Sequence, residues 1–222
     1  MSGFHLYLLA SLGQAIGSAQ AATDIRSNCA QLTQQLPAGL AQATAVHVAS
    51  GEDRPGLPAF CRITGTIATS TSSSIHVEVW LPIEERWNGN FLARGYSFCG
   101  GSMDPKVLAE ALHAGYATAT TDGGGGGERG ARFLYRQPQK LIDVGERAWH
   151  ETVRVSKALA QSFYGRAPRL SCFKGCGGEG RQGLKAAQRY PEDFDAIAVG
   201  GIAHDTPHFA FAQMHVWEVA HS

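Results

Sequence analysis

The chain has 222 residues, 19 acidic and 19 basic side chains, 27 glycines and a hydrophobic content of 44%. This length suffices for one well-filled domain, and the composition indicates a folded, turn-rich α/β protein. The balanced charge excludes the strongly basic surface that nucleic acid or an anionic membrane would attract. The sequence leaves the oligomeric state open.

The N-terminus resembles a secretory signal peptide over residues 1–21. A short apolar run, Leu6 to Leu12, precedes a small-x-small site at Ala19 and Ala21, as in export signals that are cleaved. A positively charged start is missing, and a frayed apolar segment is the alternative interpretation. Nothing later approaches the roughly 18 apolar residues that a membrane span requires. We therefore expect a secreted or periplasmic protein with no membrane partner.

Apolar periodicity predicts most regular elements after Ala59, whereas the residues before it look loop-rich. We expect helices at 105–114, 142–164 and 181–190, and strands at 59–68, 74–82, 89–95, 115–122, 169–173 and 195–201. The glycines Gly123 to Gly127 predict a flexible connector. Strands and helices alternate in the C-terminal half, which indicates a parallel sheet with crossover connections.

The segment CFKGCGGEGRQGL contains a G-x-G-x-x-G pattern at Gly175, Gly177 and Gly180. It follows a predicted strand and opens a predicted helix, as a dinucleotide-binding turn does. Such a turn also requires an acidic residue about 20 positions on, at the end of the next strand. That strand ends in glycines, and Asp193 and Asp195 come before it. Dinucleotide binding is therefore the weaker interpretation.

Several segments resemble the tannase and feruloyl esterase family. They are FCRITGTI, VEVWLPIEERWNGNFL, GYATATTD, ALAQSFYGRAPRLSCFKGC and GRQGLKAAQRYPEDFDAIAVGGIAHD. The resemblance implies an α/β-hydrolase core with a mainly parallel sheet, no cofactor, and hydrolysis of esters of hydroxylated aromatic acids through a serine acyl-enzyme. It also implies a partial core over residues 22–208 and the start of a lid region at 209–222. We therefore expect the chain to stop before the lid domain and the final strands.

The family's nucleophile turn has the pattern Gly-Cys-Ser-x-Gly-Gly-Arg, which this sequence matches at Gly175, Cys176, Gly180 and Arg181. Gly177 stands at the serine position and Glu179 at the first glycine of the pair. Glycine tolerates a strained turn but supplies no hydroxyl. Glu179 is expected to hinder the close approach of helix and strand. The resemblance also implies an oxyanion hole from the N–H of Gly178 and one N–H near Gly95 and Tyr96.

Five cysteines are many for a reduced cytosolic domain and favour an oxidising compartment. Their spacing matches no zinc site, so we expect no metal. The family resemblance implies a disulfide between Cys29 and Cys61 and leaves Cys176 unpaired. A bond between Cys99 and Cys172 is an open alternative.

The resemblance places the triad acid and histidine after the lid, so we expect neither in this chain. Local polar roles are expected for His204, Asp205, His208, His215 and His221. A nucleophilic Cys176 thiol would lack a histidine base. We therefore expect an esterase by descent, inactive as written, with a small aromatic ester as its partner. The alternative is a non-catalytic remnant or fragment that binds aromatic esters.

Overall fold

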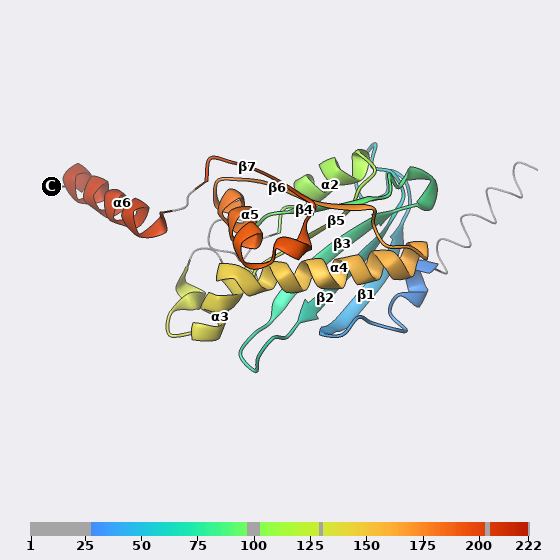
Figure 1. Ribbon diagram of the computed structural model, residues 1–222, viewed down its shortest axis with the longest axis horizontal. Coiled ribbons are helices and arrows are strands. Elements are labelled where there is room, and N and C mark those ends of the chain that lie inside the picture. Colours follow the sequence, from blue (N-terminus) through green and yellow to red (C-terminus); the bar gives the residue numbers. More distant parts are fainter. Residues whose placement is uncertain (1–27, 97–102, 129–130, 203–204, 222) are drawn as a thin grey trace, which may run out of the picture.

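A computed structural model describes residues 28–96, 103–128, 131–202 and 205–221. Its centre is a seven-stranded sheet in the order β1-β2-β3-β5-β4-β6-β7, with helices on both faces (Figure 1). The strands are β1 (Leu40–Val48), β2 (Phe60–Ile67), β3 (Ile75–Pro82), β4 (Asn90–Arg94), β5 (Ala117–Thr121), β6 (Leu170–Cys176) and β7 (Ala196–Gly200).

The structure describes several helices and helical turns, and capping residues mark two of their ends. They are α2 (Pro105–His113), α3 (Pro138–Ile142), the π-helical turn η3 (Asp143–Arg147), α4 (Ala148–Tyr164), α5 (Gly178–Arg189) and α6 (Thr206–His221), with short 3₁₀ turns at Glu84–Arg86, Arg132–Leu134 and Pro191–Asp193. Asp104 caps α2 by accepting a hydrogen bond from the Lys106 N–H (2.9 Å). Gly165 ends α4 in a left-handed conformation with φ 68°. Both helix ends were predicted from the sequence.

The sheet is mixed: its core strands are mostly parallel, as expected, and its N-terminal strands are antiparallel. Parallel pairings join β5 to β4, β4 to β6 and β6 to β7. Antiparallel pairings join β1 to β2, β2 to β3 and β3 to β5. The parallel half contains the crossovers through α4 and α5 that the alternating strand and helix patterns predicted. The antiparallel half extends this sheet through hairpins of the N-terminal region.

Two further elements differ from the sequence prediction. The region before Ala59 was expected to be loop-rich, yet it contains β1, whose pairing with β2 shifts register between Ala41 and Thr44. The helix expected at 142–164 is instead α3, η3 and α4 in succession. In η3, the buried carboxylate of Asp143 accepts hydrogen bonds from Thr69 (2.9 Å) and Arg147 (2.6 Å).

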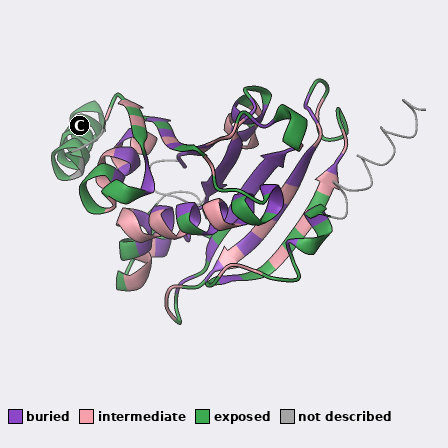
Figure 2. Cartoon of the chain, turned by 45° about the vertical axis from the view of Figure 1, so that its right-hand side comes forward, coloured by how far each residue is buried: buried purple, intermediate pink, exposed green. Residues whose placement is uncertain are grey.

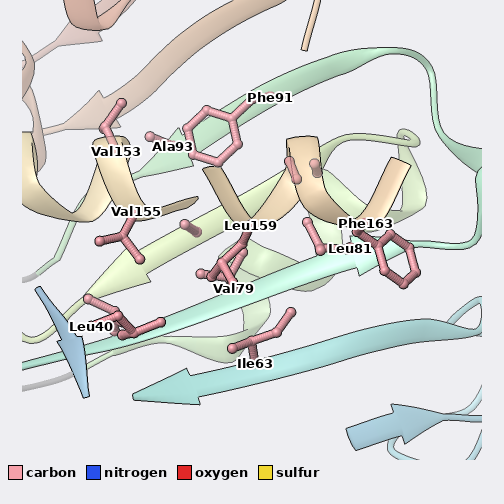
Figure 3. Packing of buried hydrophobic residues seen from close by; sticks show 14 of the residues in the cluster. Leu40, Ile63, Val79, Leu81, Phe91, Ala93, Val153, Val155, Leu159 and Phe163 are labelled. Carbon is pink, nitrogen blue, oxygen red and sulfur yellow. The ribbon is translucent and has the colours of Figure 1, made fainter. Parts of the chain in front are cut away.

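The main hydrophobic core lies between the sheet and α4 (Figure 3). Val153, Val155 and Leu159 of α4 pack against buried residues of the strands, among them Ile63, Val79, Leu81, Phe91 and Ala93. Val79 and Leu81 belong to the strand that apolar periodicity predicted at 74–82. Each such side chain contributes about 1.5–3 kcal/mol when fully buried.

The second face of the sheet is covered by α2 over only part of its width. Leu108 and Leu112 of α2 pack on Trp80 and Phe60, whereas α5 lies with α4 on the first face, against β6 and β7. Exposed and half-buried residues alternate along β7 (Figure 2).

Among the helices of the described ranges, none has the length and hydropathy that crossing a bilayer requires.

Candidate functional site

β6 meets α5 in a sharp turn at Gly177, at the carboxyl edge of the parallel strands. Gly177 has φ 64° and ψ −120°, which residues with a Cβ rarely adopt. Its N–H donates to the Gly200 carbonyl (3.0 Å). A Cβ added at Gly177 would meet no heavy atom within 4 Å. A side chain here would therefore stand in open space above the sheet edge.

Two glycines of α5 let the helix lie close against β6 and β7. A Cβ at Gly180 would come 2.8 Å from the carbonyl oxygen of Gly200, and one at Gly183 would come 2.7 Å from the Phe173 ring. Both distances are shorter than real contacts allow, so a larger residue would push the helix away from the sheet. This close packing fixes the position of the α5 N-terminus relative to the Gly177 turn.

Glu179 fits beside the turn because two glycines face its side chain. Cβ atoms added at Gly95 and Gly175 would lie 2.4 Å and 2.6 Å from the Glu179 Cβ. The hindrance that the sequence predicted for Glu179 is therefore relieved by the missing side chains at these two positions. Burial raises the pKa of Glu179, and the nearby Arg94 guanidinium opposes that shift.

The side chain of Gln182 joins α5 to the loop that follows β4. Its Oε1 accepts from the Tyr96 N–H (3.2 Å) and the Trp149 Nε1–H (2.7 Å), and its Nε2 donates to the Tyr96 carbonyl (3.0 Å). The Tyr96 hydroxyl donates to the Val144 carbonyl (2.8 Å), and burial raises the pKa of this tyrosine. The backbone N–H of Tyr96 is thus already bonded in this arrangement. The sequence did not reveal this contact, because Gln182 and Tyr96 are 86 residues apart.

The glycines after β5 are bound to Asp122, which corrects the prediction of a flexible connector. The buried Asp122 carboxylate accepts from the N–H groups of Gly124 (2.7 Å) and Gly126 (2.8 Å). The same carboxylate lies 2.9 Å from the Nδ1 of His76. Because β5 and β6 are both parallel to β4, this aspartate–histidine pair shares the carboxyl edge with Gly177. The sequence alone did not indicate this pair, since no spacing pattern joins the two residues.

The predicted disulfide between Cys29 and Cys61 is present, with a Cα–Cα distance of 5.7 Å. Cys176 is an exposed thiol that forms no disulfide among the described residues. Cys172 is also free and half-buried, and burial raises the pKa of its thiol. Cys99 lies outside the described residues. The disulfide is typical of proteins from an oxidising compartment.

One group of described side chains has the arrangement of possible metal ligands. The ligand atoms of His150, Glu192 and Asp193 lie within 4.8 Å of one another. However, the Nδ1 of His150 lies 3.1 Å from Asp193, so these two already form a hydrogen-bond contact. Burial raises the pKa of Asp193, and the contact with His150 opposes this shift.

Two of the histidines near the chain's end have local contacts. The exposed His208 Nδ1 lies 2.6 Å from Asp205, and the His221 Nδ1 lies 2.7 Å from the Trp217 carbonyl. His215 is exposed on α6. His204 lies outside the described residues.

The acidic residues near the glycine pattern lie at the opposite edge of the sheet from Gly177. Asp195 accepts a hydrogen bond from the Ser171 N–H (2.7 Å), next to the start of both β6 and β7. An acidic residue that holds the ribose of a dinucleotide would follow β7, at the carboxyl edge. The sequence prediction that these carboxylates are wrongly placed for a dinucleotide is therefore confirmed.

Comparison with known proteins finds esterases among the relatives of this chain. The chain is 41% identical over 157 residues to an uncharacterised esterase of Xanthomonas campestris pv. campestris, a match that covers 70% of this chain and 27% of the relative. It is 34% identical over 186 residues to a probable feruloyl esterase B-1 of Aspergillus oryzae, covering 82% of this chain and 33% of the relative. The crystal structure of feruloyl esterase B from Aspergillus oryzae superposes with a TM-score of 0.71 at 29% identity, over 81% of this chain and 37% of that one.

The chain thus spans about a third of the length of these relatives. A family model described as tannase and feruloyl esterase matches residues 61–222. This range includes the Gly177 turn and all strands except β1 and the first residue of β2. The chain belongs to the tannase and feruloyl esterase family.

Proposed function

We propose that this chain has the scaffold of a hydrolase for esters of hydroxylated aromatic acids and does not cleave them through an acyl-enzyme. The observation that carries the proposal is the backbone of Gly177, with φ 64° and ψ −120° at a strand-to-helix turn. A nucleophile turn of this kind exposes its serine by holding it in a strained conformation. Here the strained position has no side chain and hence no attacking oxygen.

An acyl-enzyme requires an oxygen or sulfur atom at the turn and a base that takes its proton. Cys176 has a thiol, but it precedes the strained position. Because residues of β6 alternate between the two faces of the sheet, Cys176 also lies on the face opposite to Gly175. The His76–Asp122 pair lies at the end of β5, and in the sheet order β4 separates β5 from β6. We assign neither group a role in acyl transfer.

Electrostatic stabilisation of a tetrahedral intermediate would need two backbone N–H donors. We assign the first to Gly178, the first residue of α5. The second belongs to the loop of Gly95 and Tyr96. Since the Tyr96 N–H donates to Gln182, we assign the second donor to Gly95. Such donors can bind an ester carbonyl without cleaving the ester, and a non-catalytic protein that binds small aromatic esters is the alternative function.

The test is a pre-steady-state assay of the purified chain with methyl ferulate, methyl gallate and a nitrophenyl ester. We expect no burst of alcohol product. Binding and oxyanion stabilisation alone leave room for a slow rate, up to roughly 10³ times that in water. A burst that a serine-directed phosphonate abolishes would contradict the proposal.

We also propose that the protein is secreted or periplasmic, with residues 1–21 as its signal peptide. The disulfide between Cys29 and Cys61 supports this, because such bonds persist in oxidising compartments. Mass spectrometry of the exported protein should find a mature N-terminus that begins after Ala21. An intact N-terminus on protein recovered from the cytosol would contradict it.

A further inference from the structure

The sheet has an open surface beside α2 that none of the roles above uses. Residues of β6 and β7 that point away from α5 line this surface, including Lys174, Ala196 and Ala198. Lys174, Ala196 and Ala198 are exposed, and the alternation along β7 is visible in Figure 2. A hollow of about 410 Å³ lies here between α2 and the strands, which is in the size range of small-molecule sites.

Arg94 is buried in the wall of this hollow without a full set of partners. Its residue exposure is 8%, and its Nε is a buried donor without a hydrogen-bond acceptor among the described residues. The Nη1 lies 3.3 Å from the carboxylate of Glu110, whose side chain is 67% exposed. A buried guanidinium with an unused donor is costly. Its position therefore favours an acceptor group that enters the hollow.

Lys174 places a second positive charge on the same surface. It is the register partner of Arg94 in the parallel pairing of β4 with β6, and both residues also line an adjoining hollow of about 300 Å³. No carboxylate of the described residues forms an ion pair with Lys174. Two acidic groups also line the hollows: Glu110 points largely to solvent, and burial raises the pKa of Glu179.

The other walls of the larger hollow are apolar. Small and apolar side chains surround the two cations, among them Leu92, Ala111, Ala114, Tyr116 and Ile197. Such walls accommodate a hydrocarbon or an aromatic ring, whereas a guanidinium fork matches the two oxygens of a carboxylate. We propose that this hollow is a binding site for a small carboxylic acid with an apolar body, held by Arg94 and Lys174.

This site is separate from the proposed ester function, because it recognises an acid and lies on the face opposite to α5. The test is isothermal titration calorimetry of the full chain with 3-phenylpropanoate, using 3-phenylpropanamide as the uncharged probe of the same shape. We expect one acid molecule to bind per chain, with an affinity that falls as salt is added, and the amide to bind far more weakly.

Arg94→Met should weaken binding of the acid by about 10- to 100-fold, the range for a lost charged hydrogen bond. Arg169→Met is the matched control, since Arg169 is exposed at the start of β6, and it should bind as the parent does. Arg94→Met is expected to fold, because an apolar side chain of similar length often replaces a buried charge without loss. If it does not fold, Lys174→Met tests the same site and should weaken binding several-fold.

Three results would overturn the inference. The parent chain could bind neither probe, it could bind the amide as tightly as the acid, or folded Arg94→Met could bind the acid like the parent. A fourth result concerns self-association. The carboxylate of Glu218, on the apolar helix α6, could enter the hollow of a second copy of the chain. A dimer in sedimentation analysis that Glu218→Gln dissociates would show that the carboxylate comes from another chain and would also overturn it.

Discussion

Gly177 occupies a backbone conformation that costs a residue with a Cβ about 1–3 kcal/mol. Its φ of 64° is left-handed, but the space around an added Cβ is empty, so backbone strain and not steric overlap would oppose a side chain. We expect Gly177→Ser to lower the free energy of unfolding by about 1–3 kcal/mol, as measured by urea denaturation. It should not create ester turnover, because no histidine is assigned as its base.

Gly200→Ser is the matched control for this change. Gly200 also has empty space around an added Cβ, and its φ lies outside the left-handed range. We expect its free energy of unfolding to stay within about 0.5 kcal/mol of the parent. If Gly177→Ser were as stable as the parent, the turn would not hold the strain that a nucleophile turn requires.

Glu179 should make stability depend on pH. Burial raises its pKa above the usual 4.5, so the folded protein keeps this proton at a pH where the unfolded chain releases it. The resulting stability is present at low pH and is lost as the pH rises through the folded-state pKa. We compare the free energy of unfolding of Glu179→Gln with that of the parent. We expect the difference, variant minus parent, to increase from about pH 4 to about pH 7. Urea unfolding at both pH values measures this difference, and a difference that shrinks as the pH rises would contradict the assignment.

Gln182 connects two elements, α5 and the loop after β4, through a fully buried amide. Replacing it with leucine would leave the Tyr96 N–H and carbonyl and the Trp149 Nε1–H without their partner. We expect Gln182→Leu to lower the free energy of unfolding by about 2–4 kcal/mol. Gln188→Leu, at an exposed position of the same helix, should change it by less than about 0.5 kcal/mol. Equal effects of the two changes in chemical denaturation would show that the amide contacts do not hold the loop.

Local patterns predicted the elements whose signals lie within a short window. Apolar periodicity identified β3 and α2, and glycines located the Gly177 turn. β1 was missed because its register shift and the positive φ of Gln42 (50°) disturb the alternation. The π-helical turn was missed because the carboxylate of Asp143 bonds Thr69, 74 residues away, and no local pattern records such a partner.

The same distinction applies to the candidate site. The family pattern located Gly177, Gly178 and Glu179 in the sequence, since all three belong to one turn. It did not show that Gly95 makes room for Glu179 or that Asp122 bonds His76, because these contacts join strands that are distant in sequence. The open surface at Arg94 likewise depends on the sheet order and on how far α2 covers it.

At the scale of the whole molecule, the disulfide ties the N-terminal segment to the sheet. Cys29 and Cys61 are separated by 32 residues, and closing a loop of this size contributes about 3–4 kcal/mol in the chain-entropy model. We expect the double change Cys29→Ala with Cys61→Ala to lower the free energy of unfolding by about that amount. Denaturation of the parent under reducing and non-reducing conditions should show the same difference. A loss below about 1 kcal/mol would mean that the segment is held by packing alone.

We propose that the chain combines the scaffold of an esterase family with a nucleophile turn at Gly177 that lacks a hydroxyl. Intact-mass spectrometry after incubation with a serine-directed fluorophosphonate tests this claim most directly, because the reagent leaves a stable covalent adduct on an activated serine. We expect the mass of the folded chain to remain unchanged, like the mass of the denatured chain. A stoichiometric adduct that forms only on the folded chain would show that another residue acts as the nucleophile and would contradict the account.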